Sequence, residues 1–249
     1  MPAAASHRRY SSQNEGPRSF DRILFLVQMQ PYPLTGGVSL RNWQNLNLLN
    51  AQGIVGIFSI YKGCPGVETL PQFAFWHHYD LTTPQRSLSE KVQRRLWPLR
   101  PAGNARSDWL YTHTVAQQLQ QVLHTFQPDL IVIEEIWLYR YLPHLRRQGC
   151  PIILDNHNVE GDDSRYPAGS AMTPKKLTKV RFIEEQLIRQ VDQVWMCSQP
   201  DVDQLHALYP RSRDAIAAKA QVIPNGINPD DYGAIRAGTL PPPPTLSTP

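Results

Sequence analysis

A strand followed by two glycines and a helix is the pattern in this sequence that most directly suggests a chemical task. The apolar run 23–27 predicts a buried strand, Gly36 and Gly37 follow it, and a helical pattern begins at Ser39. Adjacent glycines can adopt positive φ and bring backbone N–H groups close to a ligand, and the start of a helix carries partial positive charge. We therefore predict a phosphate-binding loop at Gly36 and Gly37, with a plain turn as the alternative.

Polar side chains also follow three later apolar runs, at the points where further strands are predicted to end. They are Glu134 and Glu135, then His157, Asn158 and Glu160, and finally Asn225 and Gly226. Because the carboxyl ends of parallel strands meet at one edge of a sheet, we expect these groups to line one cleft. Such a cleft would offer amides, carboxylates and one imidazole to a polar ligand.

Each of these residues also has a structural interpretation. A histidine can be a satisfied core residue, but the polar neighbours of His157 at a strand end favour contact with a ligand. Strand alternation would turn Glu134 and Glu135 to opposite faces, so that at most one acts on a substrate, and a solvated pair is the alternative. Asn225 and Gly226 together are a common turn sequence.

The elements that must position these residues alternate along the chain. Apolar runs predict strands at 22–28, 54–60, 129–134, 151–155, 193–197 and 220–223, and amphipathic periodicity predicts helices at 39–52, 108–126, 137–148, 174–191 and 199–209. Strands separated by single helices indicate βαβ units, so we expect an α/β fold with a doubly wound parallel sheet. Residues 61–106, which prolines interrupt, are predicted to leave the sheet.

Length and composition suit one globular domain. The chain has 249 residues, of which 41% are hydrophobic and 18% charged. This is enough for a full core. We expect a disordered basic arm at 1–19, a single domain at 20–233, and a proline-rich tail at 234–249. No apolar run is long enough to span a membrane, and residues 1–20 lack the apolar segment of a signal peptide, so we expect a cytoplasmic location.

Charge and cysteine content exclude several kinds of partner. The net charge of +4 would suit phosphorylated substrates or an anionic membrane, but it is too small to indicate nucleic acid. Cys64, Cys150 and Cys197 are an odd number without the paired spacing of a zinc site, so neither a disulfide framework nor a metal is expected. We expect no cofactor.

Residues 86–106 combine basic and apolar side chains. The basic residues are Arg86, Lys91, Arg94, Arg95, Arg100 and Arg106, and the interleaved apolar residues are Leu88, Val92, Leu96, Trp97 and Leu99. This pattern suits a peripheral helix on anionic lipid at the inner face of a membrane. A solvated cover helix with Trp97 packed inward has the same pattern.

Four segments carry a family resemblance. They are PYPLTGGV at 31–38, DNHNVE at 155–160, RQVDQVWMCS at 189–198 and VIPNGI at 222–227. In this order and spacing they resemble the N-terminal half of a GT-B glycosyltransferase of family 4, over about residues 21–232. A nucleotide-dependent dehydrogenase would instead need Gly-x-Gly-x-x-Gly after the first strand, which is absent.

The resemblance implies a Rossmann-like domain, one half of a GT-B fold, that binds the acceptor. A second domain would bind a nucleotide-sugar donor, and a hexose would be transferred with retention of configuration and without a metal. The resemblance places Gly36 and Gly37 at the donor diphosphate, His157 at the transferred sugar, Glu134, Glu135, Asn158 and Glu160 on the acceptor side, and Asn225 and Gly226 at the interdomain crossover. It requires no enzymic base, and Glu134, Glu135 and Glu160 are the candidates for one.

The family's second domain has no counterpart in the sequence. We therefore expect a nucleotide-sugar donor and a glycan or lipid-linked acceptor, as in cell-surface polysaccharide or glycolipid synthesis, with the donor domain cut off, lost or on a separate chain. On this interpretation the chain folds alone but does not transfer sugar. A non-catalytic half-transferase that supports a partner is the alternative.

Overall fold

The computed structural model describes residues 20–226, except for 33, 35, 64–71, 85, 97–98 and 168. Our expectations for the arm at 1–19 and the tail at 234–249 lie outside these residues, as do those for Cys64 and Trp97.

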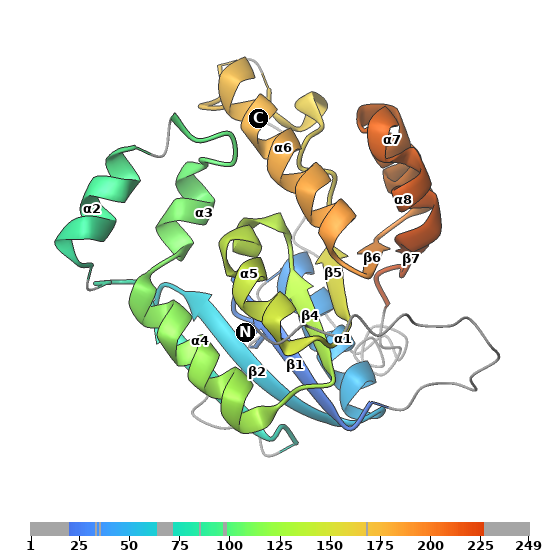
Figure 1. Cartoon of the computed structure of the whole chain (residues 1–249). Helices are drawn as coiled ribbons and strands as arrows, with labels where there is room; N and C mark the ends of the chain where they lie inside the picture. Colours follow the sequence, from blue (N-terminus) through green and yellow to red (C-terminus); the bar gives the residue numbers. More distant parts are fainter. Residues whose placement is uncertain are drawn as a thin grey trace, which may run out of the picture.

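In the described part of the chain, seven parallel strands form one sheet in the order β3-β2-β1-β4-β5-β6-β7 (Figure 1). The strands are β1 (Arg22–Val27), β2 (Ile54–Tyr61), β3 (Phe75–Asp80), β4 (Leu130–Glu134), β5 (Ile152–Asn156), β6 (Gln193–Met196) and β7 (Ala220–Val222). The chain proceeds outward from β1 to β3 and then returns to place β4 beside β1. This confirms the parallel, doubly wound sheet, and the reversal leaves a crevice at the carboxyl ends of β1 and β4.

Helices cover both faces of the sheet (Figure 1). Helix α1 (Gly37–Asn50) packs on one face. The other face is covered by α4 (His113–Phe126), η2 (Ile136–Tyr141), α5 (Leu142–Leu145), α6 (Pro174–Gln190), α7 (Gln199–Leu208) and α8 (Arg213–Lys219). The short turn η3 (Arg146–Gln148) follows α5 and has no buried residue. Helices α2 (Leu88–Arg95) and α3 (Ala105–Leu110) lie to one side, and η4 (Asp163–Arg165) and η5 (Pro210–Ser212) are short turns. In the described residues, no helix has both the length and the apolar character needed to cross a bilayer.

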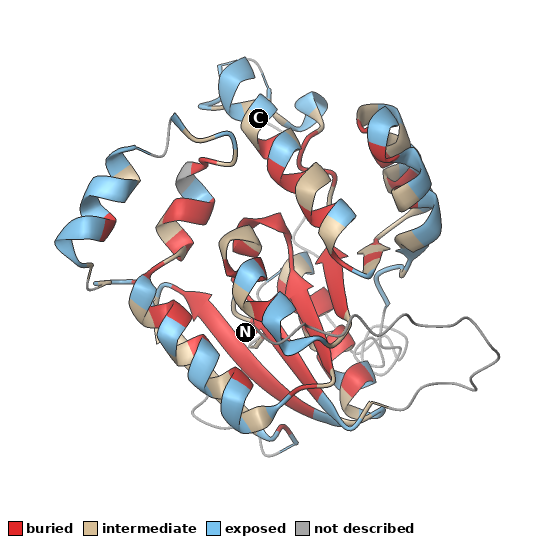
Figure 2. Cartoon of the chain, viewed as in Figure 1, coloured by how far each residue is buried: buried red, intermediate tan, exposed pale blue. Residues whose placement is uncertain are grey.

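Alternating strand residues form two apolar layers. Leu24 and Leu26 pack in the layer that includes Leu119 of α4, whereas Ile23 and Phe25 pack in the layer beneath α1. Figure 2 shows this burial concentrated on the strands and on the inward sides of the helices. Each fully buried aliphatic or aromatic side chain contributes about 1.5–3 kcal/mol, so these layers fix which strand ends meet.

The structure corrects our expectation for residues 61–106. Residues 75–80 form β3, which pairs in parallel with β2 at the edge of the sheet. An edge strand is only half-buried, so it needs no aliphatic run, and its histidines find partners locally. His77 stacks on Phe58 at 5.2 Å between ring centroids, and His78 Nε2 lies 2.6 Å from the Gly63 carbonyl.

The helix expected over 108–126 is two helices. Tyr111 and Thr112 are extended, and the Thr112 hydroxyl accepts the Val115 N–H at 3.0 Å to begin α4. Asp108 does not begin the helix. Its carboxylate instead receives Arg100 at 2.6 Å and Arg140 at 2.7 Å. The helix expected over 137–148 is likewise three short segments, η2, α5 and η3, and α8 was not predicted.

Candidate functional site

Three acidic side chains lie buried at the carboxyl ends of β4 and β5. Glu134 and Asp155 are neighbours in the β4–β5 pair, and the Glu135 N–H donates to the Asp155 carbonyl at 2.9 Å. The exposed fractions of Glu134, Glu135 and Asp155 are 0%, 4% and 0%. Buried carboxylates require charged or hydrogen-bonding partners, which here come from α1, from β1 and from the segment after β5.

Helix α1 turns polar side chains toward these carboxylates. Arg41 donates to Asp155 Oδ1 through Nε at 2.9 Å and Nη2 at 2.6 Å, and Asn45 donates to Oδ2 at 2.7 Å. Asn42 donates to Glu134 at 2.6 Å. Arg41 is 2% exposed, so this ion pair lies in the interior, where breaking one partner is costly.

His157 lies between two of the carboxylates. Its Nε2 is 3.3 Å from Asp155 Oδ2, and its Nδ1 is 3.6 Å from Glu135 Oε1. Among the described residues, Nδ1 has no hydrogen-bond partner. Burial by itself lowers the pKa of this imidazole, but the bond and charge of Asp155, followed by the two glutamates, outweigh burial and raise the pKa above its usual value. The protonated ring can therefore donate a hydrogen bond or face a negative charge.

The carboxylates differ in how firmly they are ionised. Burial raises the pKa of Glu134 to about 7, against the attraction of His157. Burial also raises the pKa of Glu135. At Asp155 burial acts in the same direction, but His157 and Arg41 outweigh it and hold the pKa below its usual value. Asp155 is thus firmly charged, whereas Glu134 can hold a proton near neutral pH and the pKa of Glu135 is shifted in the same direction as that of Glu134.

Glu135 has a backbone conformation that residues other than glycine rarely adopt, with φ 55° and ψ 166°. Such a residue costs about 1–3 kcal/mol unless the surrounding structure holds it. Gln28 after β1 holds both glutamates, because its N–H donates to Glu134 at 2.6 Å and its side-chain amide donates to Glu135. The turn ends the strand alternation, so both glutamates are buried, and the solvated pair that we considered is wrong.

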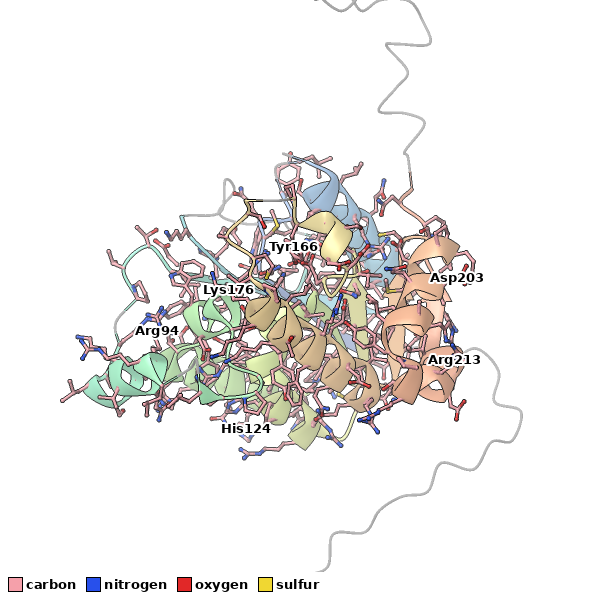
Figure 3. The ribbon with its side chains drawn as sticks, turned by 90° about the horizontal axis from the view of Figure 1, so that it is seen from above. Arg94, His124, Tyr166, Lys176, Asp203 and Arg213 are labelled. Atoms are coloured by element: carbon pink, nitrogen blue, oxygen red, sulfur yellow. The ribbon has the colours of Figure 1, made fainter. Side chains whose placement is uncertain are left out.

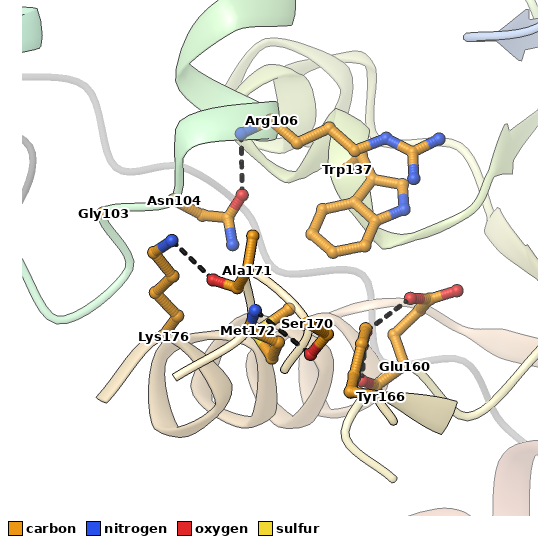
Figure 4. A pocket seen from close by; sticks show the side chains of 10 residues that line it. All are labelled: Gly103, Asn104, Arg106, Trp137, Glu160, Tyr166, Ser170, Ala171, Met172 and Lys176. Carbon is orange, nitrogen blue, oxygen red and sulfur yellow. Dashed lines mark hydrogen bonds between the residues drawn. The ribbon is translucent and has the colours of Figure 1, made fainter. Parts of the chain in front are cut away.

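A cavity of about 390 Å³ opens beside this cluster (Figure 4). Its lining includes Arg106, Trp137, Glu160, Tyr166, Met172 and Lys176. The Arg106 guanidinium lies 3.7 Å from Glu135 and 4.8 Å from the centre of the Trp137 ring, so it joins the cavity to the carboxylates. The Tyr166 hydroxyl lies 3.1 Å from Glu160 Oε2. A cavity of this size, with a mostly apolar wall and a few polar groups, is typical of a small-molecule site.

Gly36 and Gly37 occupy the start of α1. Gly36 has φ 173°, which is extended backbone that any residue adopts, and Gly37 is helical, so neither glycine uses the positive φ that it could adopt. The Gly36 N–H donates to Ser39 Oγ at 3.0 Å. A Cβ at either glycine would meet nothing within 4 Å, so the backbone at this helix start borders open space.

The structure brings most of the other predicted residues to the same edge. Asn225 Oδ1 accepts from Arg41 at 2.9 Å, and Gly226 exchanges hydrogen bonds of 3.1 and 2.6 Å with Gln44. Glu160 lies in the cavity wall, and Asn158 is half-buried after His157. In the described part of the chain, no group of three His, Cys, Asp or Glu side chains could hold a metal ion.

Several residues of the site were not predicted from the sequence. They are Gln28, Arg41, Asn42, Asn45, Asp155 and Arg106, the last of which we had assigned to the basic segment 86–106. One signal was present for α1. Arg41, Asn45 and Leu49 are spaced four residues apart and therefore lie on the same side of the helix. Two polar residues thus occupy the side of the helix on which apolar residues are expected.

Comparison with known proteins identifies the family. The family described as "Glycosyl transferase 4-like domain" matches residues 63–226, from just after β2 to beyond β7. The chain belongs to this family. Comparison with curated protein sequences gives no match.

Solved structures show the same fold at low sequence identity. Sucrose-phosphate synthase from Thermosynechococcus elongatus superimposes with a TM-score of 0.57 and 16% identity, covering 89% of this chain and 53% of that one. UGT2 of Phytolacca americana, complexed with UDP-2fluoro-glucose and pterostilbene, gives 0.52 and 9%, covering 86% and 56%. A glycosyltransferase from Rickettsia africae gives 0.50 and 14%, covering 86% and 45%.

These matches define the fold of the glycosyl transferase 4-like chain. Its seven-stranded parallel sheet is the Rossmann-like half of a GT-B fold, as the sequence predicted. The chain spans about half the length of the solved structures that it matches.

Proposed function

We propose that this domain is the acceptor-binding half of a retaining, metal-independent glycosyltransferase. It would transfer a hexose from a nucleotide-sugar donor to a glycan or a lipid-linked acceptor. The observation that carries the proposal is His157, held 3.3 Å from Asp155 and 3.6 Å from Glu135 beside the switch point of the sheet, in a chain of the glycosyl transferase 4-like family. Ligands of open α/β sheets bind at this position.

The acceptor occupies the cavity beside Arg106 and Trp137 in this proposal. The Trp137 ring and Met172 supply an apolar wall against which the faces of a sugar can pack, whereas Glu160 can accept hydrogen bonds from its hydroxyls. Because Arg106 reaches both the cavity and Glu135, the attacking hydroxyl would lie between these residues and His157.

The donor diphosphate lies at Gly36 and Gly37 in the same scheme. Breaking the bond between sugar and nucleotide leaves negative charge on the diphosphate, and the first N–H groups of α1 have no partners within the helix. Groups that are already fixed stabilise this charge without reorganising. His157 Nδ1 donates to the transferred sugar, and the leaving phosphate takes the acceptor proton, so the proposal requires no enzymic base.

Replacing His157 by Ala tests the proposal in an enzyme that joins this chain to a nucleotide-sugar-binding domain. Loss of one polar contact to the sugar costs about 1–3 kcal/mol, so kcat/KM for transfer should fall about ten- to a hundredfold. The matched control, His124→Ala, removes an exposed imidazole on α4 and should leave the rate unchanged.

Transfer that His157→Ala leaves intact would overturn the proposal and favour a non-catalytic binding subunit. Residues 1–249 alone should bind sugar nucleotides no better than about millimolar and should transfer nothing, because one helix start offers no contact to the ribose or base. Radiolabelled-sugar transfer and isothermal titration measure both quantities.

A further inference from the structure

Helix α2 carries an apolar stripe on its solvent side. Leu88 and Val92 of α2, with Leu96 and Leu99 that follow the helix, are exposed by 78%, 51%, 50% and 80% and are hereafter the apolar stripe. At 100° per residue, Leu88, Val92 and Leu96 fall within one narrow arc, and Glu90 lies on the opposite side of the helix. Glu90 is 6% exposed, so α2 turns its acidic residue inward and Leu88 and Val92 outward. Figure 2 shows the helix exposed along almost its whole length.

Fixed contacts hold α2 in this orientation. The Glu90 carboxylate accepts the N–H groups of Ser87 and His113, both at 2.7 Å. The Arg86 guanidinium donates to the carbonyls of Tyr111 at 2.9 Å and Trp109 at 2.6 Å. The outward stripe is therefore built into the fold rather than left by a loosely placed helix.

The charge around the stripe has one sign. Lys91 and Arg95 are exposed and Arg94 is half-buried, whereas Glu90, the acidic residue of α2, is buried. Lys175 and Lys176 are exposed at the start of α6. Figure 3 shows Arg94 and Lys176 on one side of the molecule, with Asp203 and Arg213 at the other end.

We propose that the apolar stripe and its flanking basic residues form a docking surface for an anionic phospholipid bilayer. Helices with leucines on one side and Lys or Arg beside them lie in the headgroup region, where the apolar side chains enter the acyl boundary and the cations meet anionic lipids. Each basic side chain near such a surface strengthens binding about fivefold. This charge complementarity favours lipid over a second copy of the chain, whose stripe would bring the same positive charges together.

Docking through α2 would also select the acceptor. The carbonyl of Arg100, which follows the stripe, accepts from Lys179 of α6 at 2.9 Å, and Lys176 of the same helix lines the cavity beside Trp137. The cavity thus lies close to the docking surface. If the proposed transferase function holds, its acceptor is a sugar carried on a membrane lipid. This identification rests on the proposed function, whereas docking does not.

Vesicle flotation of the full chain tests docking directly. The chain should float with vesicles of phosphatidylcholine mixed with phosphatidylglycerol, and not with phosphatidylcholine alone. Reversing two charges with Lys91→Glu and Arg95→Glu should weaken partitioning at least about twentyfold. Leu88→Gln with Val92→Gln should also weaken partitioning onto the same vesicles. Added salt should weaken the partitioning of the wild-type chain.

Matched controls make the same chemical changes elsewhere. Arg211→Glu with Arg213→Glu reverses two exposed charges at the far end of the molecule, and Leu48→Gln removes a leucine that is 64% exposed on α1. Both should float as the wild type does. All variants change exposed side chains, and circular dichroism checks that each is folded.

Three outcomes would overturn the proposal. They are equal flotation on both kinds of vesicle or on neither, flotation that the α2 variants leave unchanged, and a dimer that Leu88→Gln with Val92→Gln dissociates while flotation persists. Flotation needs neither donor nor acceptor. The His157→Ala variant should therefore float normally even if sugar transfer fails. The variant Lys91→Glu with Arg95→Glu should still transfer sugar to a soluble acceptor although it no longer binds the vesicles.

Discussion

At the residue scale, the end of β4 shows how backbone geometry sets side-chain chemistry. The positive φ of Glu135 directs its carboxylate to His157 and Arg106, while Glu134 keeps its strand position toward Asn42 of α1. Two consecutive acidic residues therefore serve opposite sides of the same site. Strained residues of this kind cluster at functional sites, where the surrounding contacts hold them in place.

Replacing Glu135 by Gly and by Ala separates its backbone from its side chain. Both changes remove the carboxylate, but Ala retains the strained φ, so the Gly variant should be more stable than the Ala variant by about 1–2 kcal/mol. At an unstrained position the Ala variant would be the more stable of the two, because glycine loses more conformational entropy on folding. Urea unfolding of the two variants measures the difference, and an Ala variant of equal or greater stability would contradict the assigned strain.

At the element scale, α6 fixes the segment that carries His157. Glu184 of α6 is fully buried and accepts from Asn156 at 3.0 Å and from the N–H groups of Glu160 at 2.9 Å and Gly161 at 2.8 Å. The Tyr209 hydroxyl also donates to it, at 2.5 Å. A Cβ on Gly161 would lie 2.2 Å from that hydroxyl, so only glycine allows this approach. One carboxylate thus holds both sides of the His157 segment.

Glu184→Ala should be among the most destabilising changes in α6. It leaves buried donors without acceptors, at about 1–3 kcal/mol each, so we expect a loss of about 3–5 kcal/mol after partial relaxation. Glu185→Ala, one residue along the helix, removes a half-buried carboxylate that accepts from Ser212 and should cost about 1 kcal/mol or less. Similar losses for both variants in thermal unfolding would show that the four bonds to Glu184 contribute little.

At the scale of the whole molecule, the buried cluster couples stability to pH. Burial raises the pKa of Glu134 to about 7, so the folded state keeps a proton that the unfolded state releases near its usual value. The folded state therefore binds more protons over this interval, and its stability falls as pH rises. The raised pKa of His157 acts in the same direction at pH values above the usual histidine pKa, because the folded state keeps a proton that the unfolded state releases. The lowered pKa of Asp155 has the opposite effect, because its contribution to the stability of the fold is lost only as the pH falls into the acid range.

The free energy of unfolding should thus decrease by about 3 kcal/mol between about pH 5 and pH 8. Glu134→Gln should reduce this slope, because the amide cannot ionise, while the raised pKa values of Glu135 and Glu184 leave a remainder of the same sign. Asp203→Asn, an exposed control on α7, should keep the wild-type slope. Denaturant unfolding across the interval measures the slope, and a wild type whose stability is constant or rises with pH would contradict the raised pKa of Glu134.

The sequence by itself determined six of the strands along the chain, the parallel α/β class, the family, and the polar strand ends. Apolar runs and helical periodicity are local signals, so β1, β4 and β5 were predicted to within one or two residues, and Glu134, Glu135 and His157 were identified as neighbours of strand ends. The edge strand β3 was missed because its half-buried Phe-Trp-His-His sequence lacks the aliphatic signal of a central strand.

Only the tertiary structure decided which polar groups meet. Arg41 and Asp155 are 114 residues apart in the sequence, and nothing local to either residue specifies their pairing. The same segment, 86–106, sends Arg106 into the site and Lys91 outward, because α3 packs against η2, whereas α2 is anchored through Arg86 and Glu90 and turns Lys91 to solvent. Burial, and with it the raised pKa of Glu134, arises only when strand ends and helix faces are packed together, since desolvation is a property of the assembled fold.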